Sequence, residues 1–283
     1  MSAFDPRLTP ARPDLAAKHL QGKVSAARFA DGEAREVIDA QAPVRHAPAG
    51  DALLDTEALK GERVTIYETT AEGWCWGQLE GDGFVGFIPA ETLGTLGPAP
   101  THKVAVLRTL AFPGPSIKLP PVEALSFGCK LAVARQQDEL AVTVSGVHVP
   151  ARHLVPVDAK ETDFVAVAER FVGVPYLWGG KTSLGLDCSG LVQVALHAAG
   201  IACPRDSDLQ ERALGAPVAV GDLSKLQRGD LVFWERHVGI VRDPATLLHA
   251  NAFHMAVAVE PLAEAVRRIA AAGSAVTAVK RLG

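Results

Sequence analysis

Two short patterns that each occur twice place the strongest constraint on the fold of the first half of the chain. Glu-Ala-Leu occurs at 57–59 and at 123–125, with a glycine within three residues of its end, and Pro-Ala-x-x-Leu occurs at 89–93 and at 150–154. Both patterns lie among short β-prone segments that glycine and proline interrupt, a texture typical of small barrels. We therefore expect two related small β-domains between residues 41 and 157. The alternative is one larger barrel in which the similarity arises by chance.

The pattern changes from strand-like to helix-like after Val157. Apolar residues over 164–171 follow the i, i+3, i+4, i+7 spacing of one helix face, and Gly173 can end that helix. The segments that follow suit an antiparallel sheet with helices packed on it. Near the start of the chain, Pro13 and Gly22 indicate the two ends of a short helix. The predicted organisation is an N-terminal extension (1–40), two small β-domains (41–97 and 98–157) and an α+β domain (158–283).

Composition and charge argue against several classes of protein. The 283 residues carry a formal net charge of −4 with scattered lysines and arginines, so no nucleic acid is expected as a partner. Three prolines and several charges interrupt the first 13 residues, and no stretch reaches the length of a membrane span, so we expect a cytoplasmic protein without membrane contact. The four cysteines form no Cys-x-x-Cys pair, which argues against a disulfide framework or a cysteine-based metal site.

Cys188 stands where a glycine-rich segment gives way to a helical pattern. The apolar spacing over 191–198 predicts a helix with Cys188 in its first turn, Asp187 as its N-cap and Gly200 beyond its end. A thiol in the first turn lies at the positive end of the helix dipole, which favours the nucleophilic thiolate, whereas the neighbouring carboxylate opposes it. Catalysis would therefore need a basic partner. The alternative is a cysteine that only fills the core.

Two histidines on consecutive strand-like segments are candidates for that partner. His237 begins an alternating run over 237–241, on a strand of a sheet that can pack against the cysteine helix. His249 lies on the next such segment and can orient the first imidazole through a hydrogen bond. A nucleophile and a base on separate rigid elements form the layout that acylation of a thiol requires. A single histidine on a strand is more often structural, but two of them after a helix-start cysteine favour catalysis.

Four motifs in order, YLWGGKTSLGLDCSGLV, PRDSDLQ, RGDLVFWERHVGIV and LLHANAF, resemble the NlpC-type cysteine peptidases, a family of bacterial cell-wall hydrolases, from about residue 160 to 283. The resemblance implies a papain-like α+β fold, with helices packed on an antiparallel sheet. It also implies a catalytic triad with Cys188 as nucleophile, His237 as base and His249 as orienting residue, and neither a metal nor an organic cofactor. The substrate contacts that it implies are Tyr176, Trp178, Asp187, Ser189, Asp206 and Ser207.

The two β-domains resemble bacterial SH3-like modules, and their order ahead of the peptidase domain is similar to the muropeptide-recycling branch of the family. That resemblance implies hydrolysis of the γ-D-glutamyl bond to a diamino acid, diaminopimelate or lysine, in small peptidoglycan peptides with a free N-terminal L-Ala. It also implies that an acidic residue of the first module holds the free amine, for which Asp55 and Glu57 are candidates. Either carboxylate could instead be a solvated charge.

Two other functions are compatible with the same sequence. The chain could be an SH3-like protein that binds wall peptides or a partner while its hydrolase domain is inactive, although the complete Cys-His-His set argues against this. It could also be a thiol amidase or acyltransferase on the same scaffold. The sequence leaves open the oligomeric state and the choice between diaminopimelate and lysine.

Overall fold

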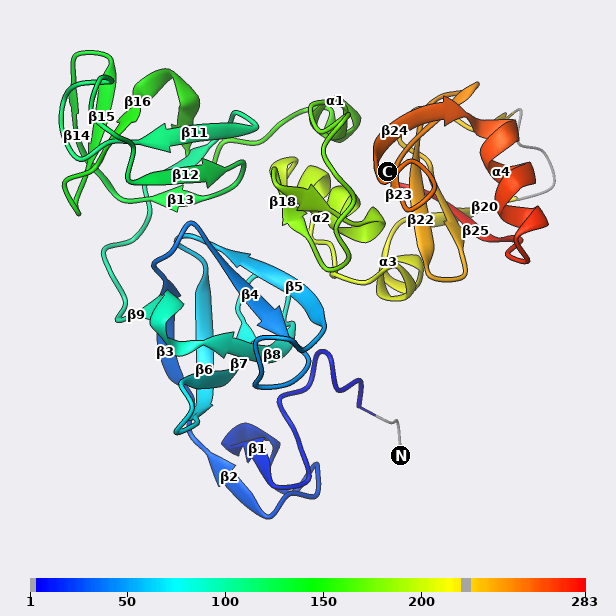
Figure 1. Cartoon of the computed structure of the whole chain (residues 1–283). Coiled ribbons are helices and arrows are strands. Elements are labelled where there is room, and N and C mark those ends of the chain that lie inside the picture. Colours follow the sequence, from blue (N-terminus) through cyan, green and yellow to red (C-terminus); the bar gives the residue numbers. More distant parts are fainter. Residues whose placement is uncertain (1–3, 220–224) are drawn as a thin grey trace. The chain divides into compact units, whose positions relative to one another are not determined.

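The computed structural model describes residues 4–219 and 225–283, and the chain divides into two compact units, residues 1–159 and 160–283 (Figure 1). The strands of the first unit are β1 (Leu15–Ala17), β2 (Arg28–Ala30), β3 (Glu33–Val37), β4 (Gln41–Arg45), β5 (Leu54–Leu59), β6 (Arg63–Thr69), β7 (Trp74–Leu79), β8 (Val85–Pro89), β9 (Leu93–Gly94), β10 (His102–Val104), β11 (Arg108–Ala111), β12 (Glu123–Ser126), β13 (Lys130–Leu131), β14 (Val133–Gln137), β15 (Leu140–Thr143), β16 (His148–Pro150) and β17 (Leu154–Pro156). Three short 3-10 helices accompany them, η1 (Lys18–Leu20), η2 (Ala90–Thr92) and η3 (Ala151–His153).

The first barrel of this unit is a seven-stranded antiparallel sheet in the order β5-β4-β8-β7-β6-β3-β9. Every second side chain along its strands points into the core, and those of Val44, Val64 and Ile88 are fully buried there. Burial of these apolar side chains is the main stabilising contribution to so small a domain. Strand β3 lies within the residues assigned above to the N-terminal extension, yet it pairs with β6 and β9.

The helix that we expected between Pro13 and Gly22 is absent, and this prediction was wrong. Residues Leu15–Ala17 instead form β1, which pairs in parallel with β2, and only one 3-10 turn, η1, follows. Leu15 is fully buried against Trp76, so tertiary packing overrides a weak local helix signal. The guanidinium of Arg12 lies 4.3 Å above the Trp76 ring, which anchors this segment to the barrel.

The repeated sequence patterns adopt the same local structure in both copies. The two Glu-Ala-Leu segments lie in β5 and β12, and each Pro-Ala-x-x-Leu segment forms a 3-10 helix, η2 or η3, that runs into a short strand. Gly61 and Gly128 follow β5 and β12 with φ of +79° and +88°, a conformation that favours glycine. The later β-segments, β10 to β17, surround a second buried cluster, which includes Val104, Leu125 and Val149 and to which Leu59 of β5 contributes.

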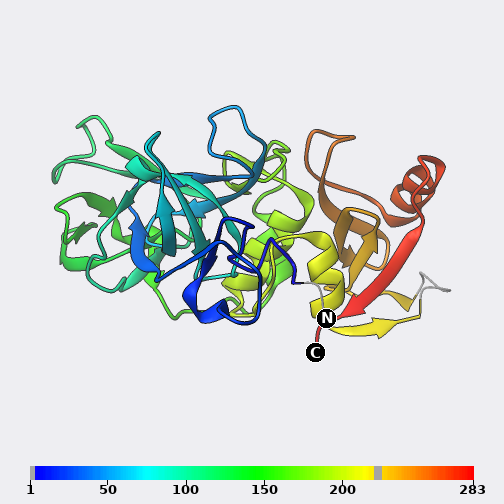
Figure 2. The same ribbon diagram turned by 90° about the horizontal axis from the view of Figure 1, so that it is seen from below.

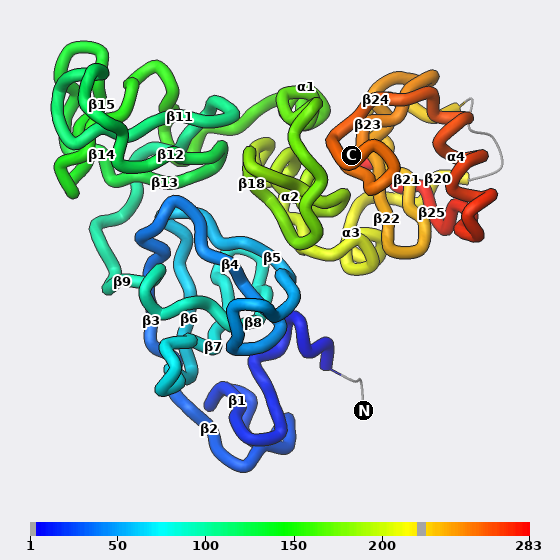
Figure 3. Tube along the Cα trace, viewed as in Figure 1, coloured from blue at the N-terminus to red at the C-terminus, as the bar shows by residue number. Residues whose placement is uncertain are grey.

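The second unit combines helices with a six-stranded antiparallel sheet, as predicted. Its elements are α1 (Phe164–Glu169), β18 (Lys181–Thr182), β19 (Gly185–Leu186), α2 (Cys188–Ala198), α3 (Ser207–Ala213), β20 (Ala216–Val218), β21 (Leu231–Trp234), β22 (His237–Asp243), β23 (Thr246–Asn251), β24 (Ala256–Pro261), α4 (Leu262–Ala271) and β25 (Val276–Arg281). The strand order is β20-β25-β21-β22-β23-β24, and Figure 3 traces these strands along the chain. Helix α2 packs on β22 and β23, whereas α4 packs on β23 and β24 (Figure 2).

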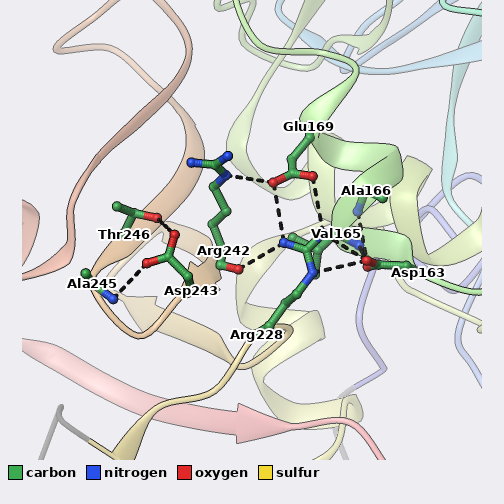
Figure 4. Close-up of polar contacts among 9 residues, drawn as sticks. All are labelled: Asp163, Val165, Ala166, Glu169, Arg228, Arg242, Asp243, Ala245 and Thr246. Carbon is green, nitrogen blue, oxygen red and sulfur yellow. Dashed lines mark hydrogen bonds and ion pairs between the residues drawn. The ribbon is translucent and has the colours of Figure 1, made fainter.

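An ion-pair network attaches α1 to the sheet (Figure 4). Asp163 caps α1 by accepting hydrogen bonds from the backbone N–H groups of Val165 and Ala166. Arg228, just before β21, lies 2.9 Å from Asp163 and 3.2 Å from Glu169. Arg242 on β22 contacts the same Glu169 at 2.7 Å. These partly exposed charges hold the first helix at the sheet on which the candidate site is built.

Candidate active site

Cys188 is the first residue of α2, as the sequence predicts. The Asp187 side chain caps the helix, since its Oδ1 accepts a hydrogen bond of 2.7 Å from the Gly190 N–H. The Cys188 Sγ lies 4.0 Å from the carbonyl oxygen of Arg236, next to the first residue of β22. Burial raises the pKa of the Cys188 thiol to about 12, and the negative charge of Asp187 raises it further. The thiol is therefore neutral in the resting site.

The two candidate histidines form a hydrogen-bonded pair. The His237 Nε2 lies 2.8 Å from the His249 Nδ1, and the two rings belong to neighbouring strands, β22 and β23. Burial lowers the pKa of both imidazoles to about 3. The charge of Arg268 lowers both values further. In addition, His249 lowers the pKa of His237, and His254 lowers the pKa of His249. A neutral imidazole can accept a proton. The geometry therefore joins a potential base to a second histidine that fixes its ring.

Glu260 and Arg268 complete this arrangement, and our sequence reasoning missed both. Glu260 lies on β24, where its Oε1 is 2.7 Å from the His249 Nε2. Arg268 on α4 donates a hydrogen bond to the same Glu260 oxygen. The sequence offers a partial signal for Glu260, because the pairing of His249 with Ala258 puts Glu260, two residues later, on the same sheet face. That signal requires the strand register, which the sequence pattern alone does not give.

Arg205 is a third residue that our sequence reasoning missed. Its guanidinium is 1% exposed and forms two bonds to the Asp187 carboxylate, Nη1 to Oδ1 at 2.8 Å and Nη2 to Oδ2 at 2.7 Å. It also donates to the Ser189 hydroxyl and to the Gly180 carbonyl oxygen. The PRDSDLQ motif contains Arg205 and was its only sequence signal. A buried arginine requires a carboxylate partner, so this residue could have been paired with an acidic side chain.

The residues predicted to contact substrate lie in different surroundings. Tyr176 is half-buried, and burial raises the pKa of its hydroxyl. Ser189 is buried beside Asp187, whereas the Trp178 side chain is exposed. Asp206 stands at the N-cap of α3, and Ser207 is its first residue. Their contacts with substrate stay predictions.

The two acidic candidates for amine recognition belong to the first unit. Both lie in β5, where Glu57 is buried and the Asp55 Oδ2 is 3.4 Å from the His46 Nδ1. Their role in holding the substrate amine stays a prediction.

One set of metal-ligand side chains comes together within residues 4–219 and 225–283. The ligand atoms of His249, His254 and Glu260 all lie within 4.8 Å of one another. The protein itself already satisfies this set, since Glu260 is paired with Arg268 and His249 is bonded on both ring nitrogens. We assign no metal to it.

Comparison with known proteins identifies one domain in each unit of the chain. Residues 173–270 match the NlpC/P60 family, and residues 44–93 match the bacterial dipeptidyl-peptidase SH3 domain. The chain is 29% identical over 240 residues to the gamma-D-glutamyl-L-lysine dipeptidyl-peptidase of Bacillus subtilis, covering 76% of this chain and 78% of the relative. It is 34% identical over 101 residues to dipeptidyl-peptidase 6 of Lysinibacillus sphaericus, but that match covers only 36% of each chain.

A solved structure supports the same assignment at the level of the fold. The crystal structure of an NlpC/P60 family protein from Bacillus cereus matches with a TM-score of 0.73 at 20% identity, covering 88% of this chain and 99% of that one. The fold and the family matches define a hydrolase of the peptidase class. Residues 173–270 thus form an NlpC/P60 domain, and a bacterial SH3 domain at residues 44–93 precedes it. The resemblance that we drew from the motifs, and the fold class, are thereby confirmed.

Among the helices within residues 4–219 and 225–283, none is both long and apolar enough to cross a bilayer.

Proposed function

We propose that the chain is a cysteine endopeptidase that hydrolyses the γ-D-glutamyl bond to a diamino acid in small peptidoglycan peptides with a free N-terminal L-Ala. The observation that carries the proposal is the bonded pair of His237 and His249, together with the carbonyl oxygen of Arg236, the residue before His237, which lies 4.0 Å from the Cys188 Sγ. The relative from Bacillus subtilis is named for a γ-D-glutamyl-L-lysine bond, which supports this class of substrate. We place the activity in muropeptide recycling in the cytoplasm.

The reaction follows from the protonation states of the resting site. The Sγ of Cys188 attacks the γ-carbonyl carbon of D-glutamate while the imidazole of His237 takes the thiol proton. The carbonyl electron pair moves to oxygen, and donors near the start of α2, with the hydroxyl of Tyr176, stabilise that charge. When the intermediate collapses, the C–N bond breaks and the leaving amine takes the proton from His237.

Water completes the cycle. It attacks the thioester and gives one proton to His237, and the C–S bond then breaks as the sulfur recovers that proton. The products are L-Ala-D-Glu and the free diamino acid or the peptide that begins with it. An amidase or acyltransferase would form the same thioester but would act on a different bond or transfer the acyl group to a different acceptor.

The experiment compares four peptides. Purified protein and its Cys188→Ala variant are incubated with L-Ala-γ-D-Glu-L-Lys, with its diaminopimelate counterpart and with the N-acetylated form of each, and products are identified by mass spectrometry. We expect L-Ala-D-Glu from the free peptides alone and none from the variant. Equal cleavage of acetylated peptides would remove the amine requirement, and transfer of the acyl group to an amine instead of water would replace the peptidase with an acyltransferase.

A further inference from the structure

A continuous line of hydrogen bonds runs from the first histidine to helix α4. His237 Nε2 is 2.8 Å from His249 Nδ1, His249 Nε2 is 2.7 Å from Glu260 Oε1, and Arg268 donates to that same oxygen. The middle of the line is shielded from water, because His249 is 1% exposed and the Glu260 side chain 10% exposed. Hydrogen bonds within such surroundings are strong and have defined directions.

We propose that Glu260, held by Arg268, is a positioning residue that sets the tautomers of both histidines and thereby makes Nδ1 of His237 the atom that receives the thiol proton. The proposal rests on the proposed function of Cys188 and His237. It assigns a role to two side chains, on β24 and α4, that lie outside the Cys-His-His set.

The ring nitrogen that carries each proton follows from the ionised carboxylate of Glu260. An ionised carboxylate only accepts hydrogen bonds, so the proton between Glu260 and His249 must sit on the His249 Nε2. A neutral imidazole carries one proton, which leaves a lone pair on the His249 Nδ1. The His237 Nε2 must then carry the proton that it donates to this lone pair, so the remaining lone pair of His237 is on its Nδ1.

Without Glu260, the opposite tautomers of His249 and His237 become accessible. His249 could carry its proton on Nδ1 and donate it to the His237 Nε2. His237 would then hold its own proton on Nδ1, the nitrogen that is not bonded to His249, and could no longer take a proton there. Second-layer carboxylates fix histidine tautomers in this way in other enzyme sites.

Arg268 keeps the carboxylate in the accepting state. Its guanidinium forms an ion pair with Glu260 and lies 4.1 Å above the ring of Phe253, so its position is fixed from two sides. The neighbouring His254 does not replace this contact, because its Nδ1 is 4.0 Å from Glu260 and 3.0 Å from the side-chain oxygen of Asn251.

The kinetic test uses two substitutions of Glu260 and one matched control. Glu260→Ala removes the acceptor, and we expect kcat to fall roughly 10- to 100-fold with KM within about twofold, as for loss of other second-layer partners. Glu260→Gln retains an oxygen that can accept from His249 and Arg268, so it should recover most of that loss. Glu264→Ala removes an exposed carboxylate from the adjacent helix α4 and should match wild type. Equal losses in the Ala and Gln variants of Glu260 would overturn the proposal.

The decisive readout is the tautomer itself. Nitrogen NMR of protein labelled with ¹⁵N-histidine distinguishes protonated from unprotonated ring nitrogens and requires no substrate. We expect protonated Nε2 and unprotonated Nδ1 on both His237 and His249 in wild type and in Glu260→Gln, and a mixed or reversed pattern in Glu260→Ala. An unchanged pattern in Glu260→Ala, or a protonated Nδ1 on His237 in wild type, would refute the role of Glu260. Because this signal does not depend on turnover, an inactive wild-type protein would refute the proposed function and leave this test intact.

Discussion

Arg205 forms a two-point ion pair with Asp187, the residue that caps the cysteine helix, and the guanidinium is almost completely shielded from water. Asp187 also accepts hydrogen bonds from the backbone N–H groups of Gly179 and Gly190. One carboxylate therefore joins the glycine-rich segment, the start of α2 and the segment before α3. This arrangement fixes where the Cys188 thiol lies.

Arg205→Met should destabilise the second unit strongly, because it leaves the Asp187 carboxylate buried without its counter-charge. The expected loss in the free energy of unfolding is about 3–5 kcal/mol. Arg212→Met, which removes the exposed ion pair with Asp208, should cost less than about 1 kcal/mol. Urea unfolding of both variants checks the prediction, and a loss no larger for Arg205 than for Arg212 would contradict it.

The pH dependence of kcat/KM follows from the two neutral groups of the resting site. Burial lowers the pKa of His237 to about 3, so its imidazole stays able to accept a proton well into the acidic range. Burial and Asp187 raise the pKa of Cys188 to about 12, so the thiol keeps its proton into the alkaline range. We therefore expect kcat/KM to be flat between about pH 5 and 7, and to fall above it only as the free N-terminal amine of the peptide loses its proton near about pH 8. We expect kcat, measured with saturating peptide, to stay flat up to about pH 9, and a fall of kcat between about pH 7 and 9 would instead indicate a resting thiolate–imidazolium pair.

Amine recognition by the first unit is tested with Asp55→Asn and Glu57→Gln. If one of these carboxylates holds the free amine of the substrate, its neutral variant should lose roughly 10-fold or more of the preference for free over N-acetylated peptide, since a charge-assisted bond contributes about 1.5–3 kcal/mol. Asp51→Asn, an exposed acidic residue of the same domain, is the control. Unchanged preference in both variants would place the recognition elsewhere.

The N-terminal segment should contribute to the stability of the first barrel. Arg12→Ala removes the contact with the Trp76 ring and the ion pair with Glu68, and we expect a loss of about 1–2 kcal/mol in the free energy of unfolding. Lys18→Ala, which removes an exposed pair with Asp31, should change the stability by less than about 0.5 kcal/mol. Thermal unfolding of the two variants decides between a structural segment and a loosely attached one.

Much of the peptidase domain could be predicted because its signals are local. A capping aspartate, the apolar spacing after it and a terminal glycine were sufficient to place Cys188 in the first turn of α2, and the alternating pattern placed His237 at the start of a strand. The motifs were specific enough to identify the NlpC/P60 domain.

The remaining features depend on contacts between distant segments. The contact between Glu260 and His249 requires the register of β23 with β24, and Arg205 meets Asp187 only after the chain has passed through α2. The expected helix near Pro13 failed for the same reason, since Leu15 gains more from burial against Trp76 than a short helix would gain from its local propensity.

The measurement that tests the central claim most directly is to trap the covalent intermediate. Wild-type protein is mixed with L-Ala-γ-D-Glu-L-Lys, or with its diaminopimelate counterpart, and quenched in acid within the first turnover; its peptides are then analysed by mass spectrometry. The account predicts an L-Ala-γ-D-Glu group bound as a thioester to Cys188, with the diamino acid released in equal amount. Turnover without any adduct on Cys188, or an adduct on Cys75, Cys129 or Cys203 instead, would contradict it.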